Sequence, residues 1–356
     1  MGLKQTLLIV NSEQFGYHVD TLKYCENLAG LYSIIYLCWD HGLEKIEKEH
    51  VDVVYVSRTG NFFSRTLRFI NQFKQHQRRR RTIVFIVYFK VMATFLKLFF
   101  PSNVFVLDVR TGHVKGSGLI RYLMDQLILL ESMMFRHVTI ISDDLATKLG
   151  IKNYTVVPLG GELIPRQELD FKDLALVYSG TLKNRNIHQV IDGVALYLRT
   201  CQPSQTLRFD VFGRGTEDDL NLIRERIRVN HLEAVVTLHG YVENSKVLRY
   251  ISDCSNIGVS YIPMTSYFDH QPPTKTFEYL LCGIPVIATG TQANIEVIND
   301  SNGVIVSDTP ESFAQGLAQV VARTGQYHTE GIQSSLRQFS WQNISLDLHK
   351  VLSKLH

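Results

Sequence analysis

Short apolar runs alternate with longer amphipathic stretches along most of the chain, and this alternation limits the fold more than any other feature of the sequence. One of the stretches, residues 119–135, has apolar residues at three- and four-residue spacing, which predicts a helix. Strands separated by helices form βαβ units with parallel strands, so we expect an α/β fold. In the first half, the runs predicted to be strands are residues 7–10, 33–37, 51–56, 82–88, 104–107, 137–141 and 154–158.

A polar stretch interrupts this rhythm near the middle of the chain. Residues 162–173 (ELIPRQELDFKD) include a proline and are typical of a linker. The alternation then restarts with a strand predicted at 174–178 and continues to a helix predicted at 311–321. A chain of 356 residues is also long enough for two domains. We therefore predict an N-terminal domain over residues 1–165, a C-terminal domain over 166–335 and a final helical segment over 336–356.

Composition and charge exclude several classes of protein. The 37 Lys and Arg residues exceed the 34 Asp and Glu residues by only three, which argues against nucleic acid as a partner. The five cysteines form no C-x-x-C pair, which favours a reducing compartment. Residues 1–6 lead directly into the first predicted strand without the pattern of a signal peptide, so we expect a cytoplasmic protein. The most apolar window, residues 82–100, contains Lys90 and Lys97 and is a poor membrane-spanning helix.

Common cofactor motifs are incomplete or absent. Residues 116–118 and 213–215 begin like dinucleotide-binding fingerprints, but Arg121 and Asp218 stand where the third glycine is needed. The sequence also has no G-x-x-x-x-G-K-[ST], H-E-x-x-H or G-x-S-x-G motif. These observations disfavour a nicotinamide or flavin enzyme, a P-loop nucleotidase, a zinc protease and an esterase.

The densest group of functional residues surrounds a predicted helix start in the second half. The sequence Pro-Pro-Thr predicts a helix that begins at Thr274 or Lys275, and its free N–H groups would favour a phosphate. Lys275 adds a positive charge, and Glu278 follows one turn later, where a carboxylate can accept hydrogen bonds from two vicinal hydroxyls. Gly283 ends the helix and residues 286–288 enter the sheet. The site is thus expected at the edge where open α/β sheets bind ligands.

These residues resemble the retaining family 4 glycosyltransferases, which have the GT-B fold of two Rossmann-like domains. In that family a Glu-x7-Glu stretch, followed by a small residue and Gly-x-Pro-Val, holds the nucleotide sugar. Glu278 matches the second glutamate, and residues 282–286 (CGIPV) match the segment that follows. His270 stands in place of the first glutamate, which contacts the donor sugar. The resemblance therefore implies a sugar contact for His270, at a position where the sequence departs from the family.

The resemblance covers roughly residues 174–345. Residues 177–186 (VYSGTLKNRN) look like the family's first strand and phosphate loop, and 211–215 (VFGRG) and 238–242 (LHGYV) resemble the next two strand ends. Residues 339–341 (FSW) are similar to the family's tail, which crosses back onto the first domain. The donor-binding residues that this resemblance implies are Gly180, Thr181, Lys183, Arg185, Gly213, Tyr241, His270, Thr274, Lys275, Thr276 and Glu278.

The acceptor side is expected in the N-terminal half, where the resemblance lies mainly in the strand–helix rhythm. Gly16 and His18 follow the first strand, where family members often have a glycine-rich loop. Asp108, Arg110 and His113 lie at a strand end where the family often keeps a histidine. Two interpretations stay open for these three: they position the acceptor hydroxyl or contact phosphate, or they form a buried pair that caps the strand. The catalytic residues that the resemblance implies are His270, Arg185, Lys275 and His113.

The resemblance implies transfer of a hexosyl-type sugar from a UDP or GDP sugar to a hydroxyl of a glycan, with retention and without an obligatory metal or other cofactor. Such enzymes commonly extend lipid-linked sugars, as in bacterial surface polysaccharide synthesis. A nucleotide-sugar 2-epimerase and a non-catalytic sugar-nucleotide-binding subunit are the alternatives.

A basic run, Arg78–Arg81, precedes the apolar, lysine-bearing stretch 89–100. Two interpretations are equally open: a peripheral face for anionic membrane at the inner side of the cell membrane, or a buried helix beside a basic loop.

Overall fold

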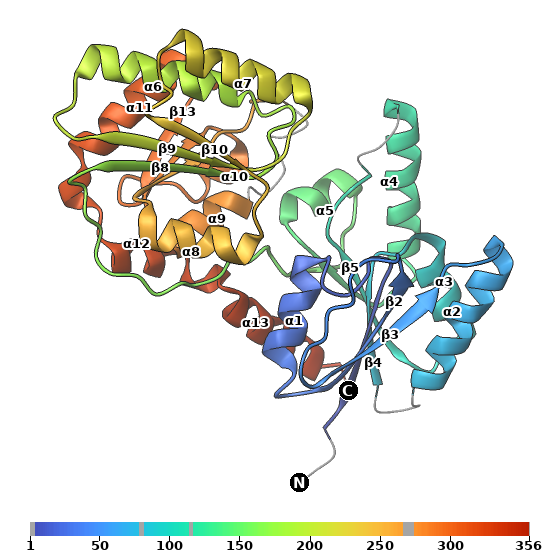
Figure 1. Cartoon of the computed structure of the whole chain (residues 1–356). Coiled ribbons are helices and arrows are strands. Elements are labelled where there is room, and N and C mark those ends of the chain that lie inside the picture. The colour runs from blue at the N-terminus through green and yellow to red at the C-terminus, as the bar shows by residue number, and fades with distance from the viewer. Residues whose placement is uncertain (1–3, 78–81, 114–116, 266–273, 356) are drawn as a thin grey trace. The chain divides into compact units, whose positions relative to one another are not determined.

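The computed structural model describes residues 4–77, 82–113, 117–265 and 274–355. The chain divides into two compact units (Figure 1). The first consists of Met1–Leu159 together with Trp341–His356, and the second of Gly160–Ser340. Each unit is a parallel sheet with helices, as the alternation of the sequence predicts.

The first unit contains a seven-stranded parallel sheet in the order β3-β2-β1-β4-β5-β6-β7. Its strands are β1 (Thr6–Asn11), β2 (Ser33–Asp40), β3 (Val51–Ser57), β4 (Thr82–Val87), β5 (Val104–Val109), β6 (His137–Ile140) and β7 (Thr155–Val156). Its helices are α1 (Val19–Leu28), α2 (Phe62–His76), α3 (Lys90–Phe99), α4 (Gly118–Ser132), α5 (Asp143–Leu149) and α13 (Trp341–Ser353). The apolar window expected at 82–100 is thus a fully buried strand followed by a helix. In the described part of the chain, no helix is long and apolar enough to cross a membrane.

Helices cover both faces of this sheet. The last helix, α13, packs on α1: the Tyr24 and Trp341 rings lie 6.1 Å apart, and Tyr32 Oη and His349 Nδ1 are 2.8 Å apart. Figure 1 shows α2, α3 and α4 on the other side of the sheet. The strand connections reverse direction after β3, and right-handed crossovers then place the following helices on that opposite face.

The second unit contains a six-stranded parallel sheet in the order β10-β9-β8-β11-β12-β13. Its strands are β8 (Leu174–Ser179), β9 (Leu207–Phe212), β10 (Val236–Gly240), β11 (Ile257–Ser260), β12 (Val286–Thr289) and β13 (Gly303–Val306). Its α-helices are α6 (Ile187–Cys201), α7 (Glu217–Val229), α8 (Asn244–Cys254), α9 (Thr274–Leu281), α10 (Gln292–Ile295), α11 (Pro310–Ala322) and α12 (Thr329–Leu336). The strand order reverses between β8 and β11, and ligands of open α/β sheets bind at the carboxyl ends of strands beside such a reversal.

Candidate functional site

Glycines follow or end the three neighbouring strands β8, β9 and β10. Gly180 N donates to the Phe212 carbonyl over 3.0 Å, and Gly213 N donates to the Gly240 carbonyl over 2.8 Å. Gly180 and Gly213 have φ angles of 149° and 153°, and a Cβ on Gly213 would lie 1.8 Å from the Gly180 carbonyl oxygen. Only glycine fits at Gly213, because the backbones approach too closely for a side chain.

A cavity of about 350 Å³ opens at these strand ends. The Arg214 guanidinium lies over the Tyr241 ring, 3.8 Å from its centre, and Tyr241 is 62% exposed. This cation–π pair presents a flat surface on which another planar ring can stack. The cavity is lined by Ser179, Gly180, Thr181, Phe212, Gly213, Arg214, Tyr241, Val242, Asn244 and Val247.

Lys275, in the first turn of α9, brings a positive charge to the same strand ends. Its Nζ lies 5.0 Å from the centre of the Tyr178 ring, and a Cβ on Gly180 would lie 3.2 Å from that nitrogen. Burial, together with the positive charge of Arg185, lowers the pKa of Lys275 to about 8, although Glu278 opposes the shift. Two cations whose charges repel each other beside a half-buried glycine backbone suit a phosphate, which would neutralise both.

Glu278 lies one turn farther along α9. Asn244 Nδ2, at the start of α8, donates to Glu278 Oε1 over 3.3 Å. Burial raises the pKa of Glu278 to about 7, against the hydrogen bond from Asn244 and the charge of Lys275. The carboxylate is therefore a strong hydrogen-bond acceptor held close to the cavity wall that Asn244 lines.

Other residues predicted on the donor side have different surroundings. Thr181 Oγ1 accepts a hydrogen bond from Lys183 N over 3.3 Å, which shapes the turn after β8. Thr274 begins α9 and is exposed. Thr276 is fully buried, and its Oγ1 lies 2.7 Å from both Ser260 Oγ and Asn294 Oδ1, so this side chain attaches α9 to the core. A donor contact at this position would therefore use the backbone. His270 lies outside the described residues.

The first unit brings Asp108 and Arg110 together in a buried ion cluster. Arg110 Nε donates to Asp20 Oδ2 over 2.7 Å, and Arg110 Nη1 donates to the Val157 carbonyl over 2.5 Å. Asp108 Oδ1 accepts from Thr139 Oγ1 over 2.7 Å, and burial raises the pKa of Asp108 to about 6. This arrangement corresponds to the second interpretation that the sequence left open. Asp108 has no exposed surface with which to contact an acceptor.

The remaining acceptor-side candidates lie in loops of the first unit. Gly16 and His18 are between β1 and α1, and His18 Nδ1 accepts from Thr21 N over 3.4 Å as the N-cap of α1. Burial lowers the pKa of His18, which favours a neutral capping group. His113 follows β5, and its backbone N donates to Asp125 Oδ1 over 2.7 Å. His113 is half-buried like His18, but its side chain caps no helix.

The sequence prediction missed three residues of the site. Asn244 holds Glu278, Arg214 stacks on Tyr241, and the Tyr178 ring lies beneath Lys275. Arg214 directly follows Gly213 at the end of β9, and this glycine could have identified Arg214 from the sequence. The roles of Asn244 and Tyr178 depend on contacts between distant parts of the chain.

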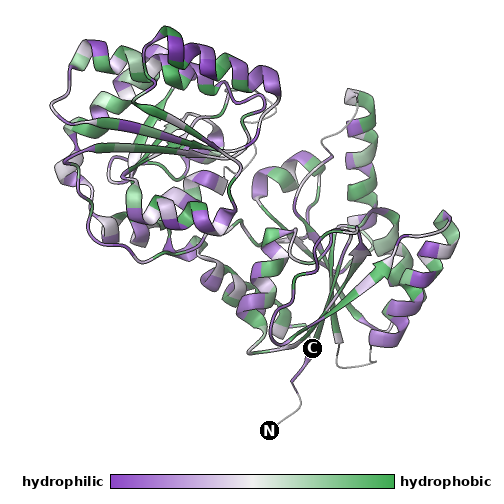
Figure 2. Ribbon diagram, viewed as in Figure 1, coloured by the Kyte–Doolittle hydropathy of each residue, from purple (hydrophilic) through white to green (hydrophobic). Residues whose placement is uncertain are grey.

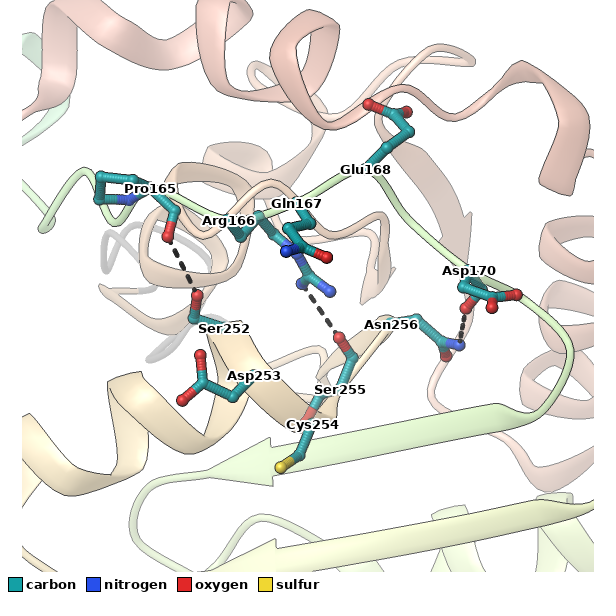
Figure 3. A pocket seen from close by; sticks show the side chains of 10 residues that line it. All are labelled: Pro165, Arg166, Gln167, Glu168, Asp170, Ser252, Asp253, Cys254, Ser255 and Asn256. Carbon is teal, nitrogen blue, oxygen red and sulfur yellow. Dashed lines mark hydrogen bonds between the residues drawn. The ribbon is translucent and has the colours of Figure 1, made fainter.

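A second cavity, of about 450 Å³, lies at the opposite edge of this sheet, where the segment leading into β8 passes the end of α8 (Figure 3). Among its described lining residues the cation is Arg166, which donates to the Ser255 carbonyl over 3.0 Å, and the carboxylates are those of Glu168, Asp170 and Asp253. This charge balance is unsuitable for a diphosphate. In the described part of the chain, no group of three His, Cys, Asp or Glu residues is placed to hold a metal ion.

Comparison with known sequences identifies the second unit. Residues 173–323 match the family described as Glycosyl transferases group 1. The GDP-mannose-dependent alpha-(1-6)-phosphatidylinositol dimannoside mannosyltransferase of Mycobacterium tuberculosis is 20% identical over 220 residues, which cover 58% of this chain and 54% of that protein. The chain thus spans about half the length of the curated relatives it matches.

Solved structures with a similar fold cover both units. The Anabaena protein Alr3699/HepE in complex with UDP has a TM-score of 0.72 at 11% identity and covers 98% of this chain and 99% of its own. A glycosyltransferase from Rickettsia africae has a TM-score of 0.70 at 13% identity, with 99% and 98% covered. The lipopolysaccharide outer core galactosyltransferase WaaB has a TM-score of 0.66 at 14% identity, with 98% and 99% covered. The family resemblance of the sequence is thereby confirmed: the second unit matches the group 1 glycosyltransferases of family 4, and the chain has the GT-B fold.

Proposed function

We propose that this protein transfers a hexosyl unit from a nucleoside diphosphate sugar to a hydroxyl of a glycan acceptor, with retention of anomeric configuration. The observation that carries the proposal is the pairing of Lys275 and Glu278 on one turn of α9, beside the glycine backbone after β8. The cation suits the diphosphate, and the carboxylate suits the vicinal hydroxyls of a ribose. The flat Arg214–Tyr241 pair at the same cavity supports stacking of the nucleobase.

The proposed chemistry depends on charge that develops on the leaving group. The bond between the anomeric carbon and the phosphate oxygen breaks, a bond to the acceptor oxygen forms, and the acceptor hydroxyl gives its proton to the departing diphosphate. Lys275 and Arg185 stabilise the departing diphosphate, together with the free N–H groups at the start of α9. A lysine with a pKa of about 8 is mostly protonated at neutral pH, and a bound phosphate raises that pKa further.

For the acceptor, we propose a lipid-linked glycan of the kind used in surface polysaccharide synthesis. Two similar proteins support this: one is named a phosphatidylinositol dimannoside mannosyltransferase, and the other a lipopolysaccharide outer core galactosyltransferase. On this side we retain His113 as the candidate group for positioning the acceptor hydroxyl, because Asp108 and Arg110 are occupied in the buried ion cluster.

The decisive experiment incubates the protein with UDP- and GDP-hexoses, with and without candidate glycan acceptors, and follows sugar transfer by mass spectrometry. We expect one donor class to give an acceptor-dependent product, and Lys275→Ala to lower its rate. Interconversion of the free nucleotide sugar without acceptor would instead identify an epimerase. Tight donor binding without transfer or slow hydrolysis would identify a non-catalytic binding subunit.

A further inference from the structure

The outer side of α4 is apolar near both ends of the helix, with Gln126 between the two apolar groups, whereas a helix on a water-facing surface normally carries polar residues there. The inner side of the helix packs into the unit through Ile128, Glu131 and Ser132, which are buried. Figure 2 shows α4 as hydrophobic over most of its turns. The exposed apolar side chains, between 53% and 75% accessible, are Leu119, Tyr122, Leu123, Leu130 and Met133. Their spacing places them on one stripe of the helix, directed away from the core.

The neighbouring helix α3 continues this surface. Thr94 Oγ1 on α3 and Tyr88 Oη just before it donate to the two carboxylate oxygens of Glu131 on α4, over 2.6 and 2.7 Å. The inner side of α3 is buried through Met92, Ala93 and Leu96. Its exposed side chains include Val91, Phe95, Leu98 and Phe99. Two helices in contact therefore both direct apolar stripes outward.

Helix α2 completes the surface on the other side of α3. The Phe73 ring of α2 and the Phe100 ring at the end of α3 lie 5.0 Å apart. At its amino-terminal end α2 exposes Phe62, Phe63 and Leu67, with Phe63 76% accessible. We call the outer side of α2, α3 and α4 the apolar face. Exposed apolar residues spread over three adjacent helices are typical of an interaction surface.

The exposed charged residues of α2, α3 and α4 are all basic. Lys74, Lys90 and Arg121 are exposed. Across α2, α3 and α4, all of whose residues the structure describes, the acidic residues are Asp125 and Glu131. Asp125 accepts the hydrogen bond from the His113 backbone, and Glu131 is buried with its two hydroxyl donors. The apolar face is therefore accompanied by exposed cations and by no exposed carboxylate.

The geometry points to a lipid bilayer that contains anionic lipid as the partner of the apolar face. Its aromatic and aliphatic side chains enter the boundary between headgroups and acyl chains, and its lysine and arginine side chains reach the headgroup phosphates. A second copy of the same face would place like charges opposite one another, which opposes self-association. This inference does not depend on the proposed sugar transfer.

Vesicle flotation of the full chain tests the inference. Binding is expected to vesicles of phosphatidylcholine mixed with phosphatidylglycerol in equal parts, to be weaker on phosphatidylcholine alone, and to decline with added salt. The triple variant Phe99→Ser, Leu123→Ser, Met133→Ser should lower partitioning at least about a hundredfold, because three apolar side chains no longer leave water. Lys74→Gln with Lys90→Gln should lower it roughly thirtyfold on the anionic vesicles, at about 1 kcal/mol per basic residue.

The matched control removes three exposed apolar residues of the second unit, as Leu222→Ser, Val229→Ser and Ile295→Ser, and should bind vesicles like the wild type. Circular dichroism verifies that every variant is folded. Wild-type protein that stays unbound on anionic vesicles would overturn the inference, as would equal flotation of the apolar-face variant and the wild type. A wild-type dimer that only the apolar-face variant converts to a monomer, without vesicle binding, would assign the face to a second copy.

Discussion

Replacing Glu278 with alanine should weaken nucleotide binding without weakening the fold. A carboxylate that accepts hydrogen bonds from both ribose hydroxyls contributes about 1.5–3 kcal/mol, the range for hydrogen bonds to charged groups. Its loss should raise the Kd of the cognate nucleoside diphosphate by about ten- to a hundredfold, because 1.4 kcal/mol corresponds to a factor of ten. Calorimetry with UDP and GDP measures the change directly.

The stability of the same variant separates a binding role from a structural one. Burial raises the pKa of Glu278 above its value in the unfolded chain, so its ionisation opposes folding as pH rises from the ordinary range of a glutamate to above about 7. Removing the group relieves this cost, and alanine is a good helix former. The melting temperature of Glu278→Ala above pH 7 should therefore equal or exceed that of the wild type.

Two comparisons make this prediction specific. Glu225→Ala, an exposed glutamate in the middle of α7, should leave the Kd unchanged. A 2′-deoxyribonucleotide should lose less affinity on the Glu278→Ala substitution than the ribonucleotide, because one hydroxyl partner is already absent. Equal binding of the ribonucleotide by wild type and variant would refute the reasoning, and so would a loss of affinity that only accompanies unfolding.

A pH dependence and three further substitutions test other parts of the structure. Nucleoside diphosphate affinity should be highest between about pH 7 and 8, because Glu278 gains a proton below this range and Lys275 loses one above it. Lys275→Arg should remove the alkaline decline in calorimetry, since a guanidinium does not titrate there. Gly213→Ala should lower the free energy of unfolding in urea by at least about 1–3 kcal/mol, because of backbone strain and the clash with the Gly180 carbonyl. Its control, Gly325→Ala, has open space around the new methyl group and should change that free energy by at most about 1 kcal/mol. Arg110→Met should cost about 3–5 kcal/mol in the same assay, because two buried carboxylates lose their cation. Lys23→Met, which replaces the partly exposed lysine of α1, is the control. It should lower the free energy of unfolding by at most about 1 kcal/mol.

The order of helices and strands could be predicted because parallel strands covered on both faces are nearly continuous apolar runs. β4 is an example, with all six residues buried. Strand lengths at the sheet edge were harder to predict. The run expected at 154–158 pairs only over Thr155–Val156, because the edge strand has a neighbour on one side alone.

Donor-site residues could be predicted where the chemistry requires close spacing along the chain. Lys275 and Glu278 share one helical turn, so their relation is visible in the sequence. Asn244 lies 34 residues before Glu278, and only the packing of α8 beside the sheet brings the two together. The helix period cannot reveal a pair of this kind.

The acceptor side shows why residue type alone was insufficient. Asp108 lies on β5 and Arg110 follows directly after the end of that strand, so the two residues are two positions apart in extended chain, as an ion pair or a binding pair would be. The deciding residue is Asp20, 90 residues away, which occupies the guanidinium of Arg110. Charged residues at a strand end thus have the same sequence signature whether they bind a ligand or stabilise the sheet, and burial distinguishes the two cases.

The same limit applies to the apolar stretches of the first unit, because the sequence does not decide between a buried helix and an exposed apolar face. The period of α4 predicts a helix correctly, but it does not indicate which side of the helix faces the sheet when both sides carry leucine and methionine. Glu131 is informative here, because a carboxylate that receives hydroxyl hydrogen bonds from Tyr88 and Thr94 must face inward. Once that side is assigned to the core, the stripe from Leu119 to Met133 has no partner within the unit. A single buried polar residue therefore determines that the remaining apolar surface of α4 is available for binding.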